Sequence, residues 1–208
     1  ASIDSVSFGA TNSRAYYAYD WVIREGCTGP IATASAIYGN VPSTALPYLE
    51  DFNNGLSCAW SVLDPGGSTW EIVDNYGTSS NLNGSKFAFV DDDGAGSTAP
   101  ATNVKLVSPI FDAVGYDTLT LEFDHYFRFF TGSAGFVEVY DGSTWVQVAS
   151  FVADLGAWSN PNHQTIDVTA YQNADFQVRF RYDDLGGSWG WFWAVDNMEL
   201  DGALAPCT

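Results

Sequence analysis

The densest group of ionisable side chains in the sequence is Asp91-Asp92-Asp93-Gly94, where an apolar run meets a glycine-rich turn. Carboxylates that lie close together on a flexible turn suit Ca²⁺, which accepts roughly six to eight oxygen ligands in loose geometry. The group does not follow the EF-hand pattern, in which a glutamate follows at a fixed distance. The spacing therefore predicts either a calcium site of another kind or three solvated turn acids.

Asp196 is a second notable acid, because it interrupts the apolar run at residues 191–198. A carboxylate buried in such a run would be costly without a cation or hydrogen-bond donors beside it. We therefore expect Asp196 to have a bound partner.

Tryptophans form a second kind of candidate site. Period-two geometry places Trp189, Trp191 and Trp193 on one face of a strand, and we expect Trp191 and Trp193 to fill a sandwich core. Trp189 is expected at the rim of a loop, where it would form an aromatic platform with Trp158 beside acids and amides. Sugars bind on platforms of this kind, although a single exposed ring is normal in proteins.

Aromatic residues occupy both faces of one expected strand. Alternation sends Phe127 and Phe129 one way and Tyr126, Arg128 and Phe130 the other. Burial of both faces, or a neighbour that covers one of them, would explain this pattern. The simpler alternative is an ordinary core with the arginine stacked on the tyrosine.

Catalytic side chains are few. His125 and His163 are the only histidines, the residue type that serves as a base near neutral pH, and neither lies in a zinc-binding or nucleophile motif. We expect His125 to be a hydrogen-bonded strand residue and His163 to be a loop residue. Acids are numerous enough for a two-carboxylate glycosidase site, but their number does not place them. The sequence therefore predicts no enzymatic activity.

Three cysteines, Cys27, Cys58 and Cys207, show no metal-binding spacing. Few lysines, one methionine and many small polar residues suit a secreted β protein, in which disulfides persist. An odd number leaves one thiol unpaired in this segment or paired outside it. We expect Cys58 to pair with Cys207, which would tie the start of the main domain to its end, with Cys27 left over.

The net charge limits which classes of partner the chain can bind. Lys and Arg number 7 against 25 Asp and Glu, which gives a formal charge of -18. Such a surface repels nucleic-acid phosphates and anionic membranes and attracts divalent cations, so we expect neither nucleic acid nor membrane insertion. No apolar run approaches the ~20 residues of a membrane span and no signal region opens the sequence, which we expect of a processed or excised segment.

The hydrophobic pattern indicates the fold class. With 208 residues, of which 46% are apolar and 15% charged, the chain is typical of a globular protein that buries its own core. Alternating β-branched and aromatic runs between turn-forming clusters predict an all-β antiparallel sandwich of the jelly-roll kind, and Asp141-Gly142 is the clearest hairpin signal. The expected strands are residues 14–24, 31–38, 46–52, 59–63, 70–73, 86–90, 104–107, 118–127, 136–140, 144–151, 164–168, 175–182 and 191–200.

A boundary near residues 40–45 divides the chain. Residues 1–42 supply too few strands to close a sandwich, so they either add to the main sheet or end a neighbouring module with an exposed edge. Residues 43–202 are expected to form the jelly-roll domain, and residues 203–208 a linker into a following module.

Several motifs in the second part of the chain resemble one family. They are LPYLEDFNNG at 46–55, KFAFVD at 86–91, LVSPIF at 106–111, LTLEF at 119–123, QVRFRY at 177–182 and WFWAVDNMEL at 191–200. Together they are similar to MAM-like jelly-roll domains of the choice-of-anchor J or cleaved adhesin type, found in secreted proteins of Bacteroidota. The resemblance covers roughly residues 46–200.

The resemblance implies a structural calcium ion between the first and last strands of the domain. By position it implies Asp51 or Asn53 together with Asp196 as ligands, joined by Asp91 or Asp93. Asn53 stands where the family typically has glutamate, so this ligand departs from the pattern.

The flanks resemble another family. The segment AYDWVIREGC at 18–27 is similar to the penultimate strand of bacterial fibronectin type III domains, and APCT at 205–208 is similar to the first residues of such a module. This implies a segment taken from a tandem array.

These observations predict a non-catalytic extracellular adhesion or assembly module of a large secreted or cell-surface protein, stabilised by calcium. Its partners would be other subunits or a host-surface protein. One alternative is a carbohydrate-binding accessory module of a secreted hydrolase, with Trp158 and Trp189 on the glycan. Another is a filament subunit whose N-terminal strands are completed by the next chain, and a third is an accessory domain of a secreted protease.

Overall fold

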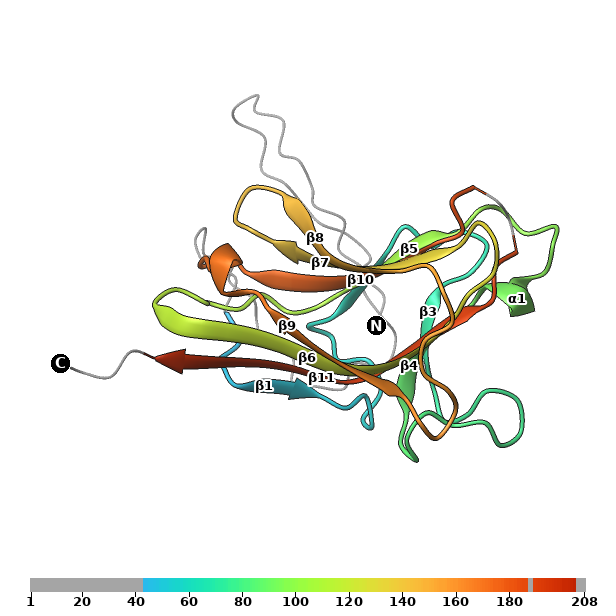
Figure 1. The fold of residues 1–208 in the computed structure, drawn as a ribbon, viewed down its shortest axis with the longest axis horizontal. Coiled ribbons are helices and arrows are strands. Elements are labelled where there is room, and N and C mark those ends of the chain that lie inside the picture. Colours follow the sequence, from blue (N-terminus) through green and yellow to red (C-terminus); the bar gives the residue numbers. More distant parts are fainter. Residues whose placement is uncertain (1–42, 187–188, 205–208) are drawn as a thin grey trace, which may run out of the picture. The chain divides into compact units, whose positions relative to one another are not determined.

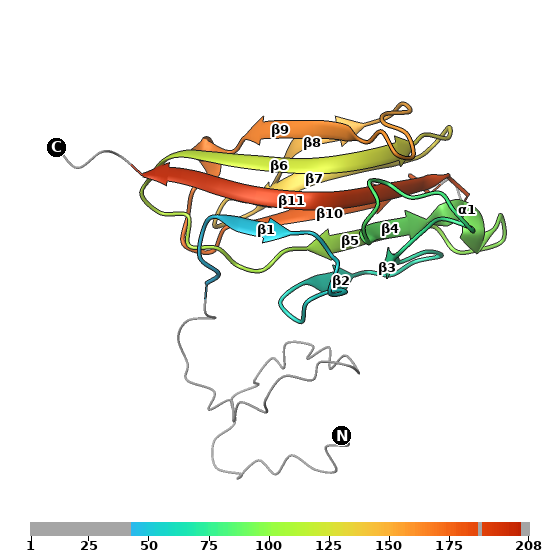
Figure 2. The same ribbon diagram turned by 90° about the horizontal axis from the view of Figure 1, so that it is seen from below.

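The computed structural model describes residues 43–186 and 189–204, which belong to the second of two compact units, Ile31–Thr208. These residues form two antiparallel sheets packed face to face (Figures 1 and 2). The predicted all-β jelly-roll sandwich is therefore confirmed. The expected strands at 14–24 and 31–38 and the predicted N-terminal segment lie outside the described residues. Within the described ranges, no helix has the length and apolar character needed to cross a bilayer.

Strands are the main regular structure of the described part, with one turn each of α-helix and 3₁₀ helix. The elements are β1 (Tyr48–Glu50), β2 (Ser61–Leu63), β3 (Trp70–Val73), β4 (Phe87–Asp91), α1 (Asp92–Ala95), β5 (Asn103–Val107), β6 (Tyr116–Arg128), β7 (Ala134–Tyr140), β8 (Trp145–Phe151), β9 (Asn162–Asp167), η1 (Thr169–Tyr171), β10 (Gln177–Asp183) and β11 (Phe192–Leu204).

The two sheets have different central strands. In the β11 sheet the order is β3-β4-β11-β6-β9, and β1 also pairs with β11. In the β10 sheet the order is β2-β5-β10-β7-β8. Strands far apart in sequence are thus neighbours, and β11 touches the first strand of the described part as well as β4 and β6 (Figure 2).

Every strand predicted between residues 46 and 200 corresponds to an observed strand, with shifts at the ends. The largest shift is in β11, which continues to Leu204 because it stays paired with β6 as far as Tyr116. The strand thus runs past the predicted domain end at residue 202. The predicted hairpin joins β7 to β8, where Gly142 has a φ of 94° and the Asp141 N–H donates to the Thr144 carbonyl at 3.0 Å.

The main core lies between the sheets and is rich in aromatic rings. Trp193 on β11 is fully buried and meets Phe127 and Phe180 edge to face, at ring-centroid distances of 5.9 and 5.8 Å. Contacts of this kind contribute beyond simple burial of apolar area. The prediction that Trp193 fills the core is confirmed.

A β-bulge in β11 keeps the core face continuous. Asp196 pairs with Asp124, but the next paired residues are Glu199 and Glu122, so β11 carries one extra residue there. Asn197 occupies the bulge with a φ of 50°. Without the extra residue, strict alternation would turn the buried Met198 out of the core.

A second aromatic cluster covers part of the outer face of the β11 sheet. Trp158 stacks on Phe192 and on Tyr76, with ring centroids 5.2 and 5.7 Å apart, and Tyr126 meets Phe192 edge to face at 5.0 Å. The two-faced burial expected around Tyr126 is therefore confirmed, because Phe127 enters the main core and Tyr126 this second cluster.

Two finer expectations for this region are wrong. Trp191 does not fill the main core but packs, partly exposed, against the second cluster. The Arg128 guanidinium lies over the ring of Trp191, 5.6 Å from its centroid, rather than on a tyrosine.

Candidate functional site

Asp196 is fully buried on the outer face of the β11 sheet, as its place in an apolar run suggested. One oxygen accepts hydrogen bonds from the Asn83 amide at 2.6 Å and the Ser85 hydroxyl at 2.9 Å, and the other accepts from the Asn197 N–H at 2.8 Å. Burial raises the pKa of Asp196 to about 6, and the charge of Asp51 adds to the rise. The expected partner is thus, first of all, a set of neutral donors.

Strand pairing brings Asp51 and Asn53 to the same place. β1 lies antiparallel to β11 with Glu50 opposite Met198, so the chain leaving β1 passes Asp196. Asp51 accepts from the backbone N–H and side-chain amide of Asn53, both at 3.0 Å, and these bonds lower its pKa.

The group formed by Asp51, Asn53 and Asp196 suits a hard cation. Its oxygens are carboxylate and amide oxygens, which Ca²⁺ accepts. The buried charge of Asp196 meets only neutral donors among the described residues, so a cation would remove an electrostatic cost. Two carboxylates are a modest set, and no cluster of three or more His, Cys, Asp or Glu side chains suited to a metal occurs in residues 43–186 and 189–204.

A shallow cavity of about 450 Å³ opens beside this group. Amides and short polar side chains dominate its wall. It is lined by Asn53, Asp74, Asn75, Asn81, Gly84, Ser85 and Lys86.

The structure places Asp91 and Asp93 elsewhere. Asp91 pairs with Phe192, four residues along β11 from Asp196, which corresponds to about 13 Å of strand. Asp91 instead caps α1, because its carboxylate accepts the Gly94 N–H at 2.9 Å. The set implied by the family resemblance is therefore split, with only three of its members meeting.

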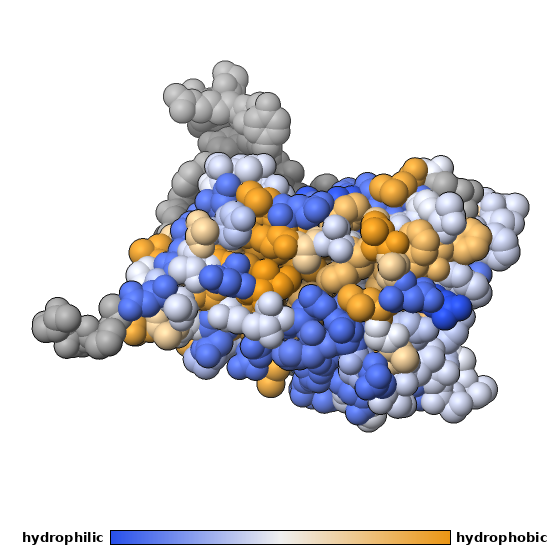
Figure 3. Space-filling model, in the orientation of Figure 1, coloured by the Kyte–Doolittle hydropathy of each residue, from blue (hydrophilic) through white to orange (hydrophobic). Residues whose placement is uncertain are grey.

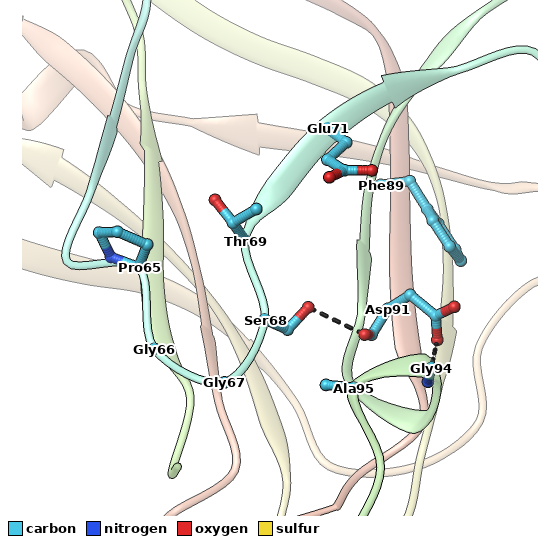
Figure 4. A pocket seen from close by; sticks show the side chains of 10 residues that line it. All are labelled: Pro65, Gly66, Gly67, Ser68, Thr69, Glu71, Phe89, Asp91, Gly94 and Ala95. Atoms are coloured by element: carbon cyan, nitrogen blue, oxygen red, sulfur yellow. Dashed lines mark hydrogen bonds between the residues drawn. The ribbon is translucent and has the colours of Figure 1, made fainter. Parts of the chain in front are cut away.

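Asp91 lines a separate pocket of about 450 Å³ between β3, β4 and α1 (Figure 4). The carboxylate of Glu71 and the ring of Phe89 lie on the same wall. The opposite wall is bare backbone at Gly66, where a Cβ would collide with the carbonyl oxygen of Ala101. Burial raises the pKa of Asp91, and neighbouring acids add to the rise. The pocket thus offers hydrogen-bond acceptors and an aromatic edge.

Two acids are buried where the sequence did not indicate it, and one of them, Asp92, is therefore not the solvated turn acid that was one of the two expectations for residues 91–93. Asp92 and Asp184 are each 2% exposed, and both bind Thr102, which donates its hydroxyl to Asp92 at 2.6 Å and its N–H to Asp184 at 3.1 Å. The Gly190 N–H also donates to Asp92. These bonds fasten α1 to the loop between β10 and β11. No sequence spacing relates residues so far apart, so only the tertiary fold reveals this role.

The two tryptophans of the predicted aromatic platform make no ring contact with each other in the described part of the chain, and the platform stays a prediction. Trp158 belongs to the second aromatic cluster, whereas Trp189 makes no ring contact among the described residues and is 46% exposed. The Trp189 indole N–H donates to the carbonyl of Asp93 at 3.2 Å, which places this ring against α1. Trp189 thus lies beside the helical turn that lines the pocket of Figure 4.

The histidines occupy contrasting positions. His125 is fully buried, accepts the Trp193 indole N–H at 3.2 Å through Nδ1, and has its pKa lowered by burial to about 4, as expected of a structural strand residue. His163 is half-exposed in β9, not in a loop as predicted, and its Nδ1 lies 2.9 Å from Asp124. Neither histidine faces a serine or cysteine nucleophile in the contacts described.

Cys58 is disulfide-bonded. Both other cysteines, Cys27 and Cys207, lie outside the described residues. The pairing of Cys58 with Cys207 therefore stays a prediction.

Comparison with known proteins identifies solved structures that have a similar fold. No protein-family model matches the sequence, and a search of curated proteins found no significant match. Among solved structures, the chain is similar to the K1 cleaved adhesin domain of Lys-gingipain from Porphyromonas gingivalis W83. The identity is 16% and the TM-score 0.57, over 76% of this chain and 98% of that domain.

Two further structures are similar. The K3 cleaved adhesin domain of the same gingipain has 16% identity and a TM-score of 0.54, over 74% of this chain and 96% of that one. TmCBM61, solved with β-1,4-galactotriose, has 13% identity and a TM-score of 0.50, over 74% and 94%. At these identities the likeness establishes a shared sandwich fold, as the resemblance to cleaved adhesin domains implied.

Proposed function

We propose that the chain is a non-catalytic extracellular recognition module for adhesion or assembly within a larger secreted or cell-surface protein. The observation that carries this proposal is the α1 end of the sandwich, where an acid-lined pocket lies next to exposed apolar loops. The fold shared with cleaved adhesin domains is consistent with it.

The exposed loops at the α1 end have the features of a contact surface. The loops after β6 and after β10 both emerge there, because Arg128 pairs with Phe192 and Asp183 with Ala134. Three of their large apolar side chains are open to solvent: Phe130 at 45%, Leu185 at 59% and Trp189 at 46%. Leu185 and Trp189 also have positive φ angles, 53° and 80°. Such strained backbone is concentrated at functional sites.

Adhesion through this end is tested with Trp189→Ala and the matched control Asn75→Ala, which lies in a loop by the other cavity. The probes are a panel of immobilised extracellular-matrix proteins and cultured epithelial cells. Trp189→Ala should reduce binding at least tenfold with the melting temperature unchanged, because rigid aromatic anchors dominate interfaces. Equal binding by both variants would exclude the α1 end.

Carbohydrate binding is the second candidate, favoured by the pocket of Figure 4. Glu71 and Asp91 would supply acceptors for sugar hydroxyls, and Trp189, which lies against α1 outside the pocket lining, would supply an apolar ring for stacking. A glycan array read with wild type, Trp189→Ala and Trp158→Ala separates the cases. Loss on Trp189→Ala alone supports this pocket, loss on Trp158→Ala alone supports the second cluster, and no glycan bound by wild type leaves adhesion.

The filament alternative depends on residues 1–42, which lie outside the described residues. Sedimentation of the full chain over a range of concentrations tests it, since strand exchange predicts assembly that grows with concentration. A monomer at every concentration would reject it.

The proposal includes a structural calcium ion bound by Asp51, Asn53 and Asp196. An ion there would neutralise the buried carboxylate and tie the end of β1 to β11. At a free concentration 100 times its dissociation constant, a bound ion stabilises a fold by about 2.7 kcal/mol.

Unfolding of the full chain in CaCl₂ and in chelator measures this gain. Asp196→Asn should abolish the difference, whereas the control Asp91→Asn should retain it. The opposite pattern would move the ion to α1, and no difference for wild type would reject calcium as a structural element.

A further inference from the structure

One stretch of the outer face of the β11 sheet is crowded with acids. The ladder aligns Thr165 with Glu122 and Glu122 with Glu199, so two glutamates stand directly opposite each other. Like charges in that relation destabilise a sheet. The acids of neighbouring rungs point to the same face, because the residues between them enter the main core. This acid stripe consists of Glu122, Asp124, Asp167, Glu199 and Asp201.

Basic side chains hardly offset the acid stripe. β9 and β11 contain no Lys or Arg, and the arginine of β6 lies at the far end of that strand, over Trp191. His163 is the base within reach, with Nδ1 2.9 Å from Asp124 and Nε2 3.7 Å from Glu122. One half-exposed histidine cannot balance five acids, so the stripe favours a cationic partner.

The acid stripe ends at a free strand edge. Among the described residues β9 pairs only with β6, and its ladder from Asn162 to Asp167 is unbroken. The neighbouring edge strand, β8, differs, because a register shift at Val148 interrupts its pairing with β7. A bulge of this kind protects an edge from strand addition. Of these two edges, the unbulged β9 edge is therefore the one open to a further strand.

An apolar band runs along the same side, between the edges of the two sheets. Figure 3 looks onto this side and shows hydrophobic side chains gathered along it. Val146 and Val148 of β8, Ile166 of β9 and Leu155 of the loop between them pack against the core yet stay partly exposed, and Val152 is 60% exposed. An apolar strip beside an open edge marks an interaction site.

We propose that an extended segment of another protein, alternating apolar with Lys or Arg residues, adds to the free edge of β9. Successive side chains of a strand point to opposite faces, so its apolar residues would cover the apolar band. Its basic residues would stand at the margin of the acid stripe, next to Asp167 on β9, with Glu122 and Asp124 on the next strand. A second copy of this chain is a poor occupant, because its formal charge of -18 repels the stripe. The surface is separate from the α1 end.

The test is fluorescence anisotropy of the full chain with a labelled ten-residue peptide that alternates Lys and Val. Binding should weaken at least tenfold when Glu replaces Lys in the peptide, and should weaken as NaCl is raised, because exposed charges are screened. The variant Glu122→Gln/Glu199→Gln should weaken binding about fivefold without loss of stability, since it relieves the opposed glutamates. Trp189→Ala should leave peptide binding unchanged, so failure here is distinct from failure of the α1 end.

Hydrogen exchange with the same peptide locates the strand. Protection should appear at the amides of β9 and not at those of β8. Protection at β8, equal binding of the Glu peptide, or no binding at all would overturn the proposal. Dimers seen by sedimentation without peptide and dispersed by Ile166→Glu would also overturn it, because they would make a second copy the occupant.

Discussion

The two faces of the β11 sheet treat a buried ionisable group differently. His125 and Asp196 occupy neighbouring rungs, because His125 pairs with Val195 and Asp124 with Asp196, yet they point to opposite faces. Burial favours the neutral form of each, lowering the pKa of the histidine and raising that of the aspartate. The core face gives His125 one indole donor, whereas the outer face surrounds Asp196 with three donors and a second carboxylate nearby. The core face thus holds its buried ionisable group mainly by packing, and the outer face holds its own by hydrogen bonds.

The largest effect should come from removing one tryptophan on each face. Trp193→Ala should lower the free energy of unfolding by about 4 kcal/mol, because a fully buried indole leaves a cavity between the sheets. Trp158→Ala should cost about 2 kcal/mol, because that ring is partly exposed in the second cluster. Urea denaturation measures both, with the exposed Trp189→Ala as control. Equal losses for Trp193 and Trp158 would mean that the outer cluster contributes as much to the free energy of unfolding as the main core does.

The next largest effect is a dependence of stability on pH, which follows from the shifted pKa values of Asp196 and His125. Folding raises the pKa of Asp196 to about 6, so its contribution to stability falls as the pH rises from about 4 to about 6, by about 3 kcal/mol. Folding lowers the pKa of His125 to about 4, so its contribution falls as the pH drops from about 6.5 to about 4, by a similar amount.

The pH dependences of stability due to Asp196 and His125 have opposite signs. A variant that removes one group should therefore reveal the pH dependence due to the other. In the presence of chelator, Asp196→Asn should lose stability on acidification, and His125→Gln should gain it. Urea denaturation at about pH 4.5 and about pH 6.5 gives the sign of each change. If both variants kept the wild-type dependence of the unfolding free energy on pH, Asp196 and His125 would not be the groups that cause it.

The smallest effect tests the crowding of charge on the outer face. Glu199→Lys should raise the free energy of unfolding by about 0.5 kcal/mol, because it turns a like-charge pair with Glu122 into an attractive one. Asp117→Lys makes the same change in net charge at an exposed position away from that pair. Thermal unfolding at low salt compares the two, and high salt should erase the difference. An equal gain from both would reflect net charge alone.

Strand positions could be predicted because alternation is a local signal. In β11, Trp193 and Val195 point inward and Ala194 outward, as period two requires. The bulge at Asn197 could not be foreseen, because it is set by pairing with β6. That same pairing decides which acids of the outer face stand opposite each other.

Much less of the candidate site could be predicted. The apolar setting of Asp196 marked it correctly as a buried acid in need of partners, but two of its three donors, Asn83 and Ser85, come from a loop far away in sequence. The placement of Asp91 beside Asp196 came from family position, and the register between β4 and β11 separates them. Trp158 carried no local sign that its ring would stack inside a cluster rather than face a ligand.

The pairing of β1 with β11 determines how the unit would respond to tension along the chain. Tyr48 lies opposite Leu200, so the chain enters and leaves the sandwich side by side (Figure 2). Pulling on these two points would load the hydrogen bonds between β1 and β11 one after another rather than all at once, after the bond from the Thr44 N–H to the Ile110 carbonyl, so β1 would detach stepwise. An ion bound at Asp51 would stop this detachment at the end of β1. The force needed to unfold the unit would then depend on the calcium concentration.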